Sequence, residues 1–401
     1  MNPQPRFDER AITAGTTMRF VLLVALLVVS SGAMVTQVLH IRAIAPSQHG
    51  TGCLLSAGAD PFDGTDTGTL IAGLNQYDAY EACVDRFEPA PSWWPATVWT
   101  ALLVAAAGAV FWAIPRWKAR RGRSLPLHLM DFDGQVGREL AQFSMAAGLG
   151  RVPRAVVDPT VTTATAVVFG RNRRPVIRLH GGLLARRSSD PDRYRAVLLH
   201  ELAHVRNGDI TLTYATIALW RVFLLLVLLP YAVWLLYDLP AKTRAVDWEQ
   251  QAPGFTRSIV LVIAMTALVY LARSDVLRSR EIHADLTALR WGADPHGWTG
   301  READPTGGAL RRTVRSFVQL WRTHPQWELR RRSLADPAAL FELRALPMFL
   351  TGAAAALFGD QIGEYLGSRG QSGAWVQQAT ELIAAGLVTG VAAVALWRAV
   401  V

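Results

Sequence analysis

The sequence predicts a mainly α-helical, multi-span membrane protein that also carries a small α+β domain. Two observations predict this fold class. The 401 residues are 51% hydrophobic and only 18% charged, and the apolar residues gather in runs long enough to cross a bilayer. Between these runs lie two polar segments, 124–210 and 273–344, which are long enough to fold together against the membrane.

Four apolar segments are the clearest candidate spans, at about 19–41, 95–114, 222–237 and 258–272. The first is too long for the apolar core of a signal peptide, and no small-residue cleavage site clearly follows it, so we interpret it as a retained anchor. Two weaker segments, 346–358 and 382–397, are either further spans or buried helices, since about 20 apolar residues are needed to cross.

Basic residues set the expected orientation. Three arginines precede the first span, and the run "RWKARRGR" follows the second, whereas residues 46–96 contain seven acidic residues and one arginine. By the positive-inside rule, the N-terminus and the polar segments face the cytoplasm, which predicts a multi-pass protein of the cell membrane. The net charge of +9 then reflects juxtamembrane arginines beside lipid headgroups. We expect no nucleic-acid partner, because the chain shows no nucleic-acid-binding motif.

The predicted organisation alternates between membrane and cytoplasm. The five parts are 1–123, a hairpin with an outer loop at 46–95; 124–210, the first cytoplasmic part; 211–272, a second hairpin; 273–344, the second cytoplasmic part; and 345–401, C-terminal helices. Both cysteines, Cys53 and Cys83, lie in the outer loop, where a disulfide is favoured over two free thiols.

The first cytoplasmic part begins with a helical pattern and continues with three short β-branched runs, "RAVVD", "TATAVVFG" and "PVIRLH", which predict a small sheet. A helix should then run from Pro191 to Gly208, with Asp190 as its N-cap. Its sequence includes "HELAH". His200 and His204 are four residues apart on one face, where two imidazoles can bind one tetrahedral zinc, and the adjacent Glu201 can accept a proton from water.

That pattern also arises by chance, so a third ligand is needed. The segment "RSREIHADLTA", residues 278–288, follows the fourth span and returns to the same side of the membrane. Glu281 can complete a His₂Glu ligand set, and Asp285, one helical turn further on, can accept a hydrogen bond from a ligand histidine. A charged helix whose side chains pair with one another is the alternative interpretation.

A third segment, "WRTHPQWELRRRSLADP" at 321–337, completes a resemblance. The three segments resemble the signatures of the integral-membrane zinc metallopeptidases that include the HtpX heat-shock protease and the CAAX prenyl endopeptidases. That family combines HExxH and an Asn-x-Asp turn with an Arg-Glu-x-x-Ala-Asp helix and a Thr-His-Pro turn followed by an arginine. The matching positions are His200, Glu201, His204, Asn207, Asp209, Arg280, Glu281, Ala284, Asp285, Thr323, His324, Pro325 and Arg330.

The resemblance covers about residues 125–345 and implies an α+β, zincin-like catalytic domain with one Zn²⁺ per chain. His200, His204 and Glu281 would be the metal ligands and Glu201 the general base. Asp285, Asn207 and Asp209 would support the ligands. His324 would donate a hydrogen bond to the oxyanion, and Arg330 would contact that oxygen or the glutamate. A peptide or membrane-protein substrate would add to an edge strand at the positions Thr165, Ala166 and Val167.

Two features depart from this picture. The family usually has Asn-Ala where this chain has Thr165 and Ala166, which removes an amide from the expected substrate strand. Arg221 lies inside an apolar region. We expect its long side chain to reach the inner interface, with the span beginning after it, and the alternative is a cation facing an interior cavity.

The sequence therefore predicts a membrane-embedded zinc endopeptidase with its site at the cytoplasmic face, serving membrane-protein quality control. Two alternatives remain. One is a sensor metallopeptidase that reads a signal through its outer loop and cleaves a cytoplasmic repressor. The other is a non-catalytic membrane scaffold with a structural zinc. The sequence leaves open whether the chain forms a homo-oligomer.

Overall fold

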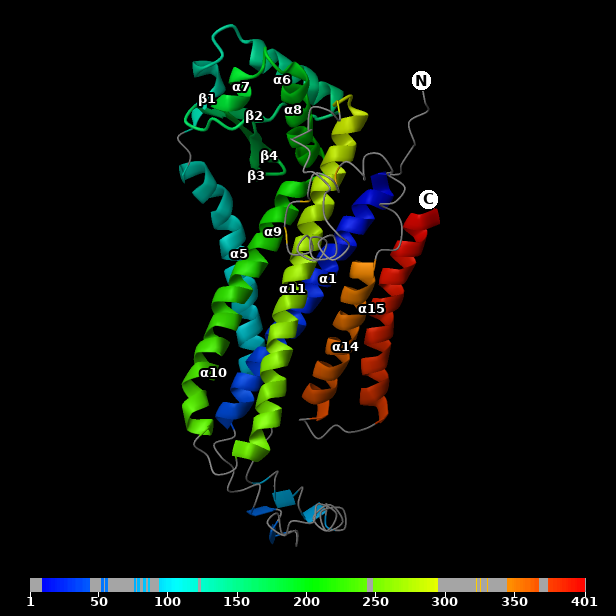
Figure 1. The fold of residues 1–401 in the computed structure, drawn as a ribbon. Coiled ribbons are helices and arrows are strands. Elements are labelled where there is room, and N and C mark those ends of the chain that lie inside the picture. Colours follow the sequence, from blue (N-terminus) through cyan, green and yellow to red (C-terminus); the bar gives the residue numbers. More distant parts are fainter. Residues whose placement is uncertain are drawn as a thin grey trace, which may run out of the picture.

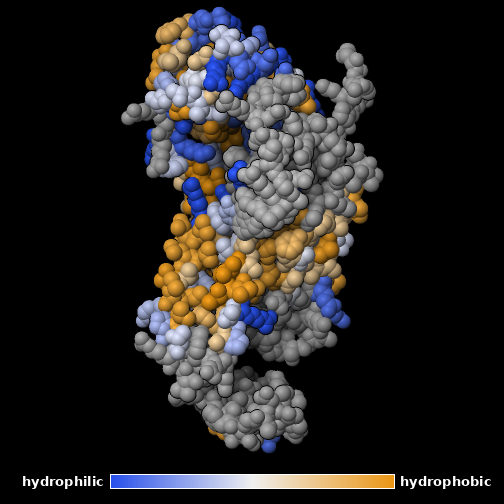
Figure 2. Space-filling view, viewed as in Figure 1, coloured by the Kyte–Doolittle hydropathy of each residue, from blue (hydrophilic) through white to orange (hydrophobic). Residues whose placement is uncertain are grey.

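A computed structural model describes residues 9–43, 94–121, 124–243, 248–294, 345–367 and 374–400, together with isolated positions between these stretches. A small α+β domain lies at one end of a bundle of long helices (Figure 1). On the face shown in Figure 2, hydrophobic residues cover much of the bundle and hydrophilic residues cover much of the domain. The expected fold class, a mainly helical membrane protein with a small sheet, is confirmed.

The bundle helices are α1 (Glu9–Ala43), α5 (Trp94–Arg121), α9 (Asp209–Val222), α10 (Leu229–Lys242), α11 (Trp248–Arg290), α14 (Ala345–Gly367) and α15 (Ala374–Val400). Helix α1 packs along α11, α5 packs on α9, and α14 pairs with α15. Their shared core includes the buried side chains of Leu26, Phe223, Tyr231, Val269 and Ala354. Because lipid tails are as apolar as these side chains, their close van der Waals packing holds the helices together.

Four stretches of helix are long and apolar enough to cross a membrane: Ala14–Val35, Val98–Arg120, Asp209–Tyr237 and Phe255–Arg290. The two C-terminal helices contain shorter apolar parts, Leu346–Leu357 and Ala384–Trp397. The third stretch begins earlier than the sequence indicated, so Arg221 lies within the apolar helix, with its side chain exposed. A π-helical segment, η2 (Phe223–Leu228), joins α9 to α10 just before Pro230, whose ring prevents a regular α-helical turn.

Helix α11 is a single helix of 43 residues, about 65 Å long at 1.5 Å per residue. The expected span at 258–272 and the expected ligand segment at 278–288 are therefore one continuous element. The reason is local, because the chain has no glycine or proline between residues 258 and 290. The helix carries its apolar part and Glu281 as one rigid body.

The domain contains one four-stranded sheet in the order β1 (Leu125–Pro126), β2 (Arg154–Asp158), β4 (Arg174–His180) and β3 (Ala166–Arg171). Strand β2 pairs parallel to β4, and β3 pairs antiparallel to β4 and forms an edge. Helices α6 (Gln135–Ala146), α7 (Gly181–Ala185) and α8 (Pro191–Arg206) pack around it. At the start of α7, Gly182 allows the loop before β3 to approach closely, since a Cβ there would lie 1.8 Å from the Thr162 carbonyl oxygen.

The outer loop is described only at isolated positions, which include both cysteines. Cys53 and Cys83 form a disulfide bond, with their Cα atoms 5.6 Å apart. The two cysteines lie between α1 and α5 in the chain, and the end of α1 and the start of α5 are at the end of the bundle opposite the sheet (Figure 1).

Candidate metal centre

Helix α8 has well-defined ends. The Asp190 side chain accepts a hydrogen bond from the Arg193 backbone N–H at 3.2 Å, as an N-cap does, and Pro191 fills the first helical position. At the other end Gly208 has φ of 72°, which turns the chain directly into α9 at Asp209. These two ends place His200 and His204 on one buried face near the end of α8.

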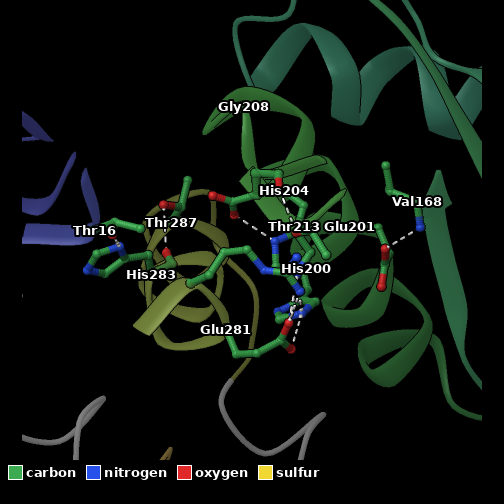
Figure 3. Close-up of polar contacts among 12 residues, drawn as sticks. Thr16, Val168, His200, Glu201, His204, Gly208, Thr213, Glu281, His283 and Thr287 are labelled. Atoms are coloured by element: carbon green, nitrogen blue, oxygen red, sulfur yellow. Dashed lines mark hydrogen bonds and ion pairs between the residues drawn. The ribbon is translucent and has the colours of Figure 1, made fainter. Parts of the chain in front are cut away.

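Three side chains from two helices converge on one point (Figure 3). The Nε2 atoms of His200 and His204 are 3.2 Å apart. The Glu281 carboxylate of α11 approaches both, at 3.7 Å from His200 Nε2 and 3.6 Å from His204 Nε2. One ligand atom from each residue lies within 4.8 Å of the others, so this buried group could hold a metal ion.

Each histidine has an acidic partner on its other ring nitrogen. His200 Nδ1 lies 2.8 Å from Asp285 Oδ1, and His204 Nδ1 lies 2.8 Å from Asp209 Oδ2. A carboxylate at Nδ1 favours the proton on that nitrogen, which leaves the Nε2 lone pair for the shared point. Two facing lone pairs and a carboxylate repel one another unless a cation lies between them, so the donor set fits zinc.

The electrostatics of the centre also favour a cation. Burial alone would lower the pKa of His200, but the hydrogen bonds and charges of Asp285 and Glu281 raise it to about 10. A bound metal ion would balance the negative charges of Asp285 and Glu281 while the His200 imidazole stays neutral.

Glu201 lies beside the ligand residues, but its side chain is directed toward strand β3. Its Oε2 accepts a hydrogen bond of 2.8 Å from the backbone N–H of Val168 in β3 (Figure 3). Burial raises the pKa of Glu201 above its ordinary value, against the opposing charges of the two histidines. The Glu201 carboxyl group therefore lies where a group that exchanges protons could meet both the ligands and a strand edge.

The register of β3 shows which backbone groups face outward. The His180 N–H donates to the Thr165 carbonyl at 3.2 Å, so Thr165 and the residues two and four further along face β4. Ala166 and Val168 therefore direct their backbone groups away from the sheet, and Val168 meets Glu201 there. The side chain of Thr165 bonds to His180 Nδ1 at 2.8 Å, while Val167 is exposed. The threonine that replaces the expected asparagine thus interacts with the neighbouring strand.

The remaining predicted residues have different positions. Arg330 donates to both carboxylate oxygens of Asp285. Asp285 in turn bonds to His200, so Arg330 contacts the metal centre through Asp285 and helps to hold that carboxylate in position. Asn207 is the C-cap of α8 with an exposed side chain, and among the described residues it forms no hydrogen bond to either histidine. His324 lies outside the described residues.

Two supporting contacts were not predicted from the sequence. Asn172, in the turn between β3 and β4, donates to the Gly208 carbonyl at 2.9 Å and accepts from the Thr211 N–H at 3.2 Å. It fixes the turn that carries Asp209. From the sequence "GRNRR" alone, Asn172 is predicted only to be a turn residue. Its hydrogen-bond partner could not be predicted, because Gly208 lies 36 positions away.

The second contact joins α1 to the ligand-bearing helix. The Thr16 hydroxyl bonds to His283 Nδ1 at 2.8 Å, and Arg19 forms an ion pair with Asp275 at 2.8 Å. Both pairs connect residues more than 250 positions apart. The spacing of residues within one segment cannot predict contacts between residues so far apart in the sequence.

Comparison with known proteins agrees with this geometry. The model of peptidase family M48 matches residues 133–338, which is just over half of the chain. A protease HtpX homolog of Syntrophobacter fumaroxidans is 30% identical over 231 residues, covering 53% of this chain and 79% of that protein. Protease HtpX homologs of Pyrococcus furiosus (25% over 215 residues, 49% and 71%) and Bacillus pumilus (27% over 249 residues, 55% and 78%) are also similar.

No solved structure matches the chain significantly. The matched region contains the histidines of α8, the strand edge at β3 and the glutamate of α11, so it includes every described residue of the metal centre. The chain belongs to peptidase family M48, as an HtpX-like membrane metallopeptidase.

Proposed function

We propose that this chain is a zinc endopeptidase of the cell membrane, with its metal centre on the cytoplasmic side. The observation that carries the proposal is the convergence of His200, His204 and Glu281, with Glu201 next to that point and hydrogen-bonded to the edge strand β3. The orientation rests on the excess of basic residues around α1 and after α5. By likeness to HtpX proteases, its proposed duty is the removal of damaged membrane proteins.

His200, His204 and Glu281 would hold the zinc, one ion per chain. When bound, the ion acts as a Lewis acid that polarises a carbonyl group and makes water acidic. Asp285 and Asp209 keep the two imidazoles in the tautomer that presents Nε2, and Arg330 holds Asp285 in place through two hydrogen bonds. Glu201 would accept the proton of the attacking water and pass it to the leaving amine.

The substrate would lie along β3. The outward backbone groups of Ala166 and the outward carbonyl of Val168 can pair with an extended peptide by β-augmentation. The peptide would then lie beside Glu201, which accepts the Val168 N–H. His324 would donate a hydrogen bond to the oxyanion, on the resemblance of the Thr-His-Pro segment to that of the family. The catalytic domain then consists of segments 124–210 and 273–344, which are joined through the membrane hairpin between them.

The test is proteolysis of an unfolded protein substrate by the full chain in nanodiscs. Wild-type protein should cleave internal peptide bonds, and Glu201→Gln should not, although it keeps its zinc. Asp192→Asn, which removes an exposed carboxylate from the same helix, is the matched control and should cleave normally. Equal cleavage by wild type and Glu201→Gln would reject the proposed mechanism.

A further inference from the structure

The turn between β3 and β4 forms part of an exposed basic surface. Arg171, Arg173 and Arg174 surround this turn, and all three are exposed. The end of α5 contributes Arg116 and Arg120, which are also exposed. We call these five arginines the basic platform.

One aromatic ring joins the two halves of the basic platform. The Trp112 ring, 50% exposed, has the Arg171 guanidinium 3.9 Å from its centroid and the Arg116 guanidinium 4.2 Å away. A further hydrogen bond of 2.9 Å runs from the Arg178 guanidinium of β4 to the Lys118 carbonyl of α5. The strand turn and the helix end are therefore held as one surface.

Among the residues that the structure describes, no carboxylate forms an ion pair with an arginine of the basic platform. The ion pairs within 4 Å between described residues involve other cations of the chain. Like charges on one exposed surface repel one another, so an anionic partner would stabilise them.

The position of the platform indicates which partner it fits. The apolar stretch Val98–Arg120 ends within it, and in Figure 2 hydrophilic residues lie between the hydrophobic surface of the bundle and the domain. An exposed tryptophan flanked by arginines at the end of a span is typical of the membrane interface. We propose that the basic platform binds the phosphate headgroups of anionic phospholipids and thereby fixes the membrane-facing end of β3.

This contact would act on the strand that meets Glu201. The turn is tied to α9 through Asn172, and only a few residues separate Arg171 from Val168, whose N–H bonds to Glu201. Anionic lipid should therefore order the outward edge of β3 where a substrate strand would add. That consequence rests on the proposed function, whereas lipid binding itself does not.

The first experiment measures amide hydrogen exchange of residues 166–174, using the full chain in nanodiscs of phosphatidylcholine with or without phosphatidylglycerol. Exchange at the turn should slow by about fivefold or more with the anionic lipid, since each arginine near such a surface contributes about that factor. The slowing should disappear in about 0.5 M salt, which screens surface charge. The salt dependence is measured on the wild-type protein, so it does not depend on whether a variant folds.

The triple variant Arg171→Ser, Arg173→Ser, Arg174→Ser should lose the slowing by anionic lipid. The matched control removes three arginines that lie on or next to α6, α7 and α8, outside the basic platform: Arg138→Ser, Arg186→Ser and Arg193→Ser. It should respond like wild type. Inorganic phosphate added to phosphatidylcholine nanodiscs should not reproduce the effect.

Three results would overturn the proposal: no difference between the lipids in wild type, equal loss in the control variant, or full replacement of the lipid by free phosphate. Proteolysis in the same nanodiscs is measured separately. If no proteolysis is found but exchange slows with anionic lipid, the proposed function fails and lipid binding stands.

Discussion

The two ends of the helix bundle are stabilised in different ways. At the domain end, α8, α9 and α11 meet through buried polar side chains, and the three ligand residues are separated by as many as 81 positions in sequence, from His200 to Glu281. At the opposite end, one disulfide joins Cys53 and Cys83, which are 30 positions apart. The first end depends on the placement of several elements at once, and the second closes a single loop. Substitutions should therefore affect catalysis strongly at the first end and weakly at the second.

The largest effect is expected at Glu201. Glu201→Gln removes the proton acceptor but keeps the size of the side chain and the ligands of the metal. We expect kcat/KM to fall by about 10²- to 10⁴-fold, with unchanged zinc content. Cleavage assays and metal analysis on the same preparation check both statements. A parallel loss of zinc would mean that Glu201 holds the metal centre together and would weaken its assignment as a base.

The carboxylates behind the histidines should have the next largest effect. Asp285→Asn and Asp209→Asn each replace a charged acceptor at Nδ1, so we expect zinc affinity to fall by about 10- to 100-fold. Competition with a zinc chelator measures the change. Asp192→Asn is the control for loss of a carboxylate on α8. If Asp285→Asn binds zinc as tightly as wild type, the 2.8 Å contact with His200 has no bearing on the metal.

A smaller effect is expected at the turn that supports Asp209. Asn172→Ala removes the hydrogen bonds to Gly208 and Thr211, which should cost about 1 kcal/mol of stability. Thermal unfolding of the zinc-loaded protein checks this. Asn207→Ala, at an exposed asparagine of α8, should be close to neutral. The reverse order of the two variants would show that Asn207 has the supporting role that the sequence motif implied.

The smallest effect on catalysis is expected at the disulfide. Cys53→Ser with Cys83→Ser opens the outer loop, far from the metal ligands, so zinc content and kcat/KM should stay within about twofold of wild type. The loop itself should become more sensitive to proteolysis, because a disulfide restricts the unfolded loop. Loss of activity with zinc still bound would contradict this comparison and favour a sensor that reads a signal through the outer loop.

The sequence predicted the parts of the site that follow local spacing. His200, Glu201 and His204 lie within one helical turn, and the ends of α8 follow from Asp190, Pro191 and Gly208. The fold class and the presence of a small sheet were also predictable, because hydrophobic length and β-branched runs carry that information. The edge position of the strand at Ala166 was implied only by the family resemblance.

Other features depend on packing, which spacing alone does not report. The continuity of α11 was missed because a polar stretch inside a helix resembles a boundary between span and domain. The bond between Glu201 and Val168, the contact of Arg330 with Asp285 and the contact of Thr16 with His283 each join separate elements. Sequence patterns assign these residues to their elements but do not show which of them meet.

The most direct test of the account is zinc per chain in the detergent-purified protein, wild type against Glu281→Ala. Asp192→Ala, which removes an exposed carboxylate from α8, is the control for loss of an acidic side chain that is not a ligand. We predict about one zinc in wild type and in the control, and lost or much weaker binding in Glu281→Ala, as three protein ligands require. Equal zinc in wild type and Glu281→Ala would contradict the claim that α8 and α11 form one metal centre.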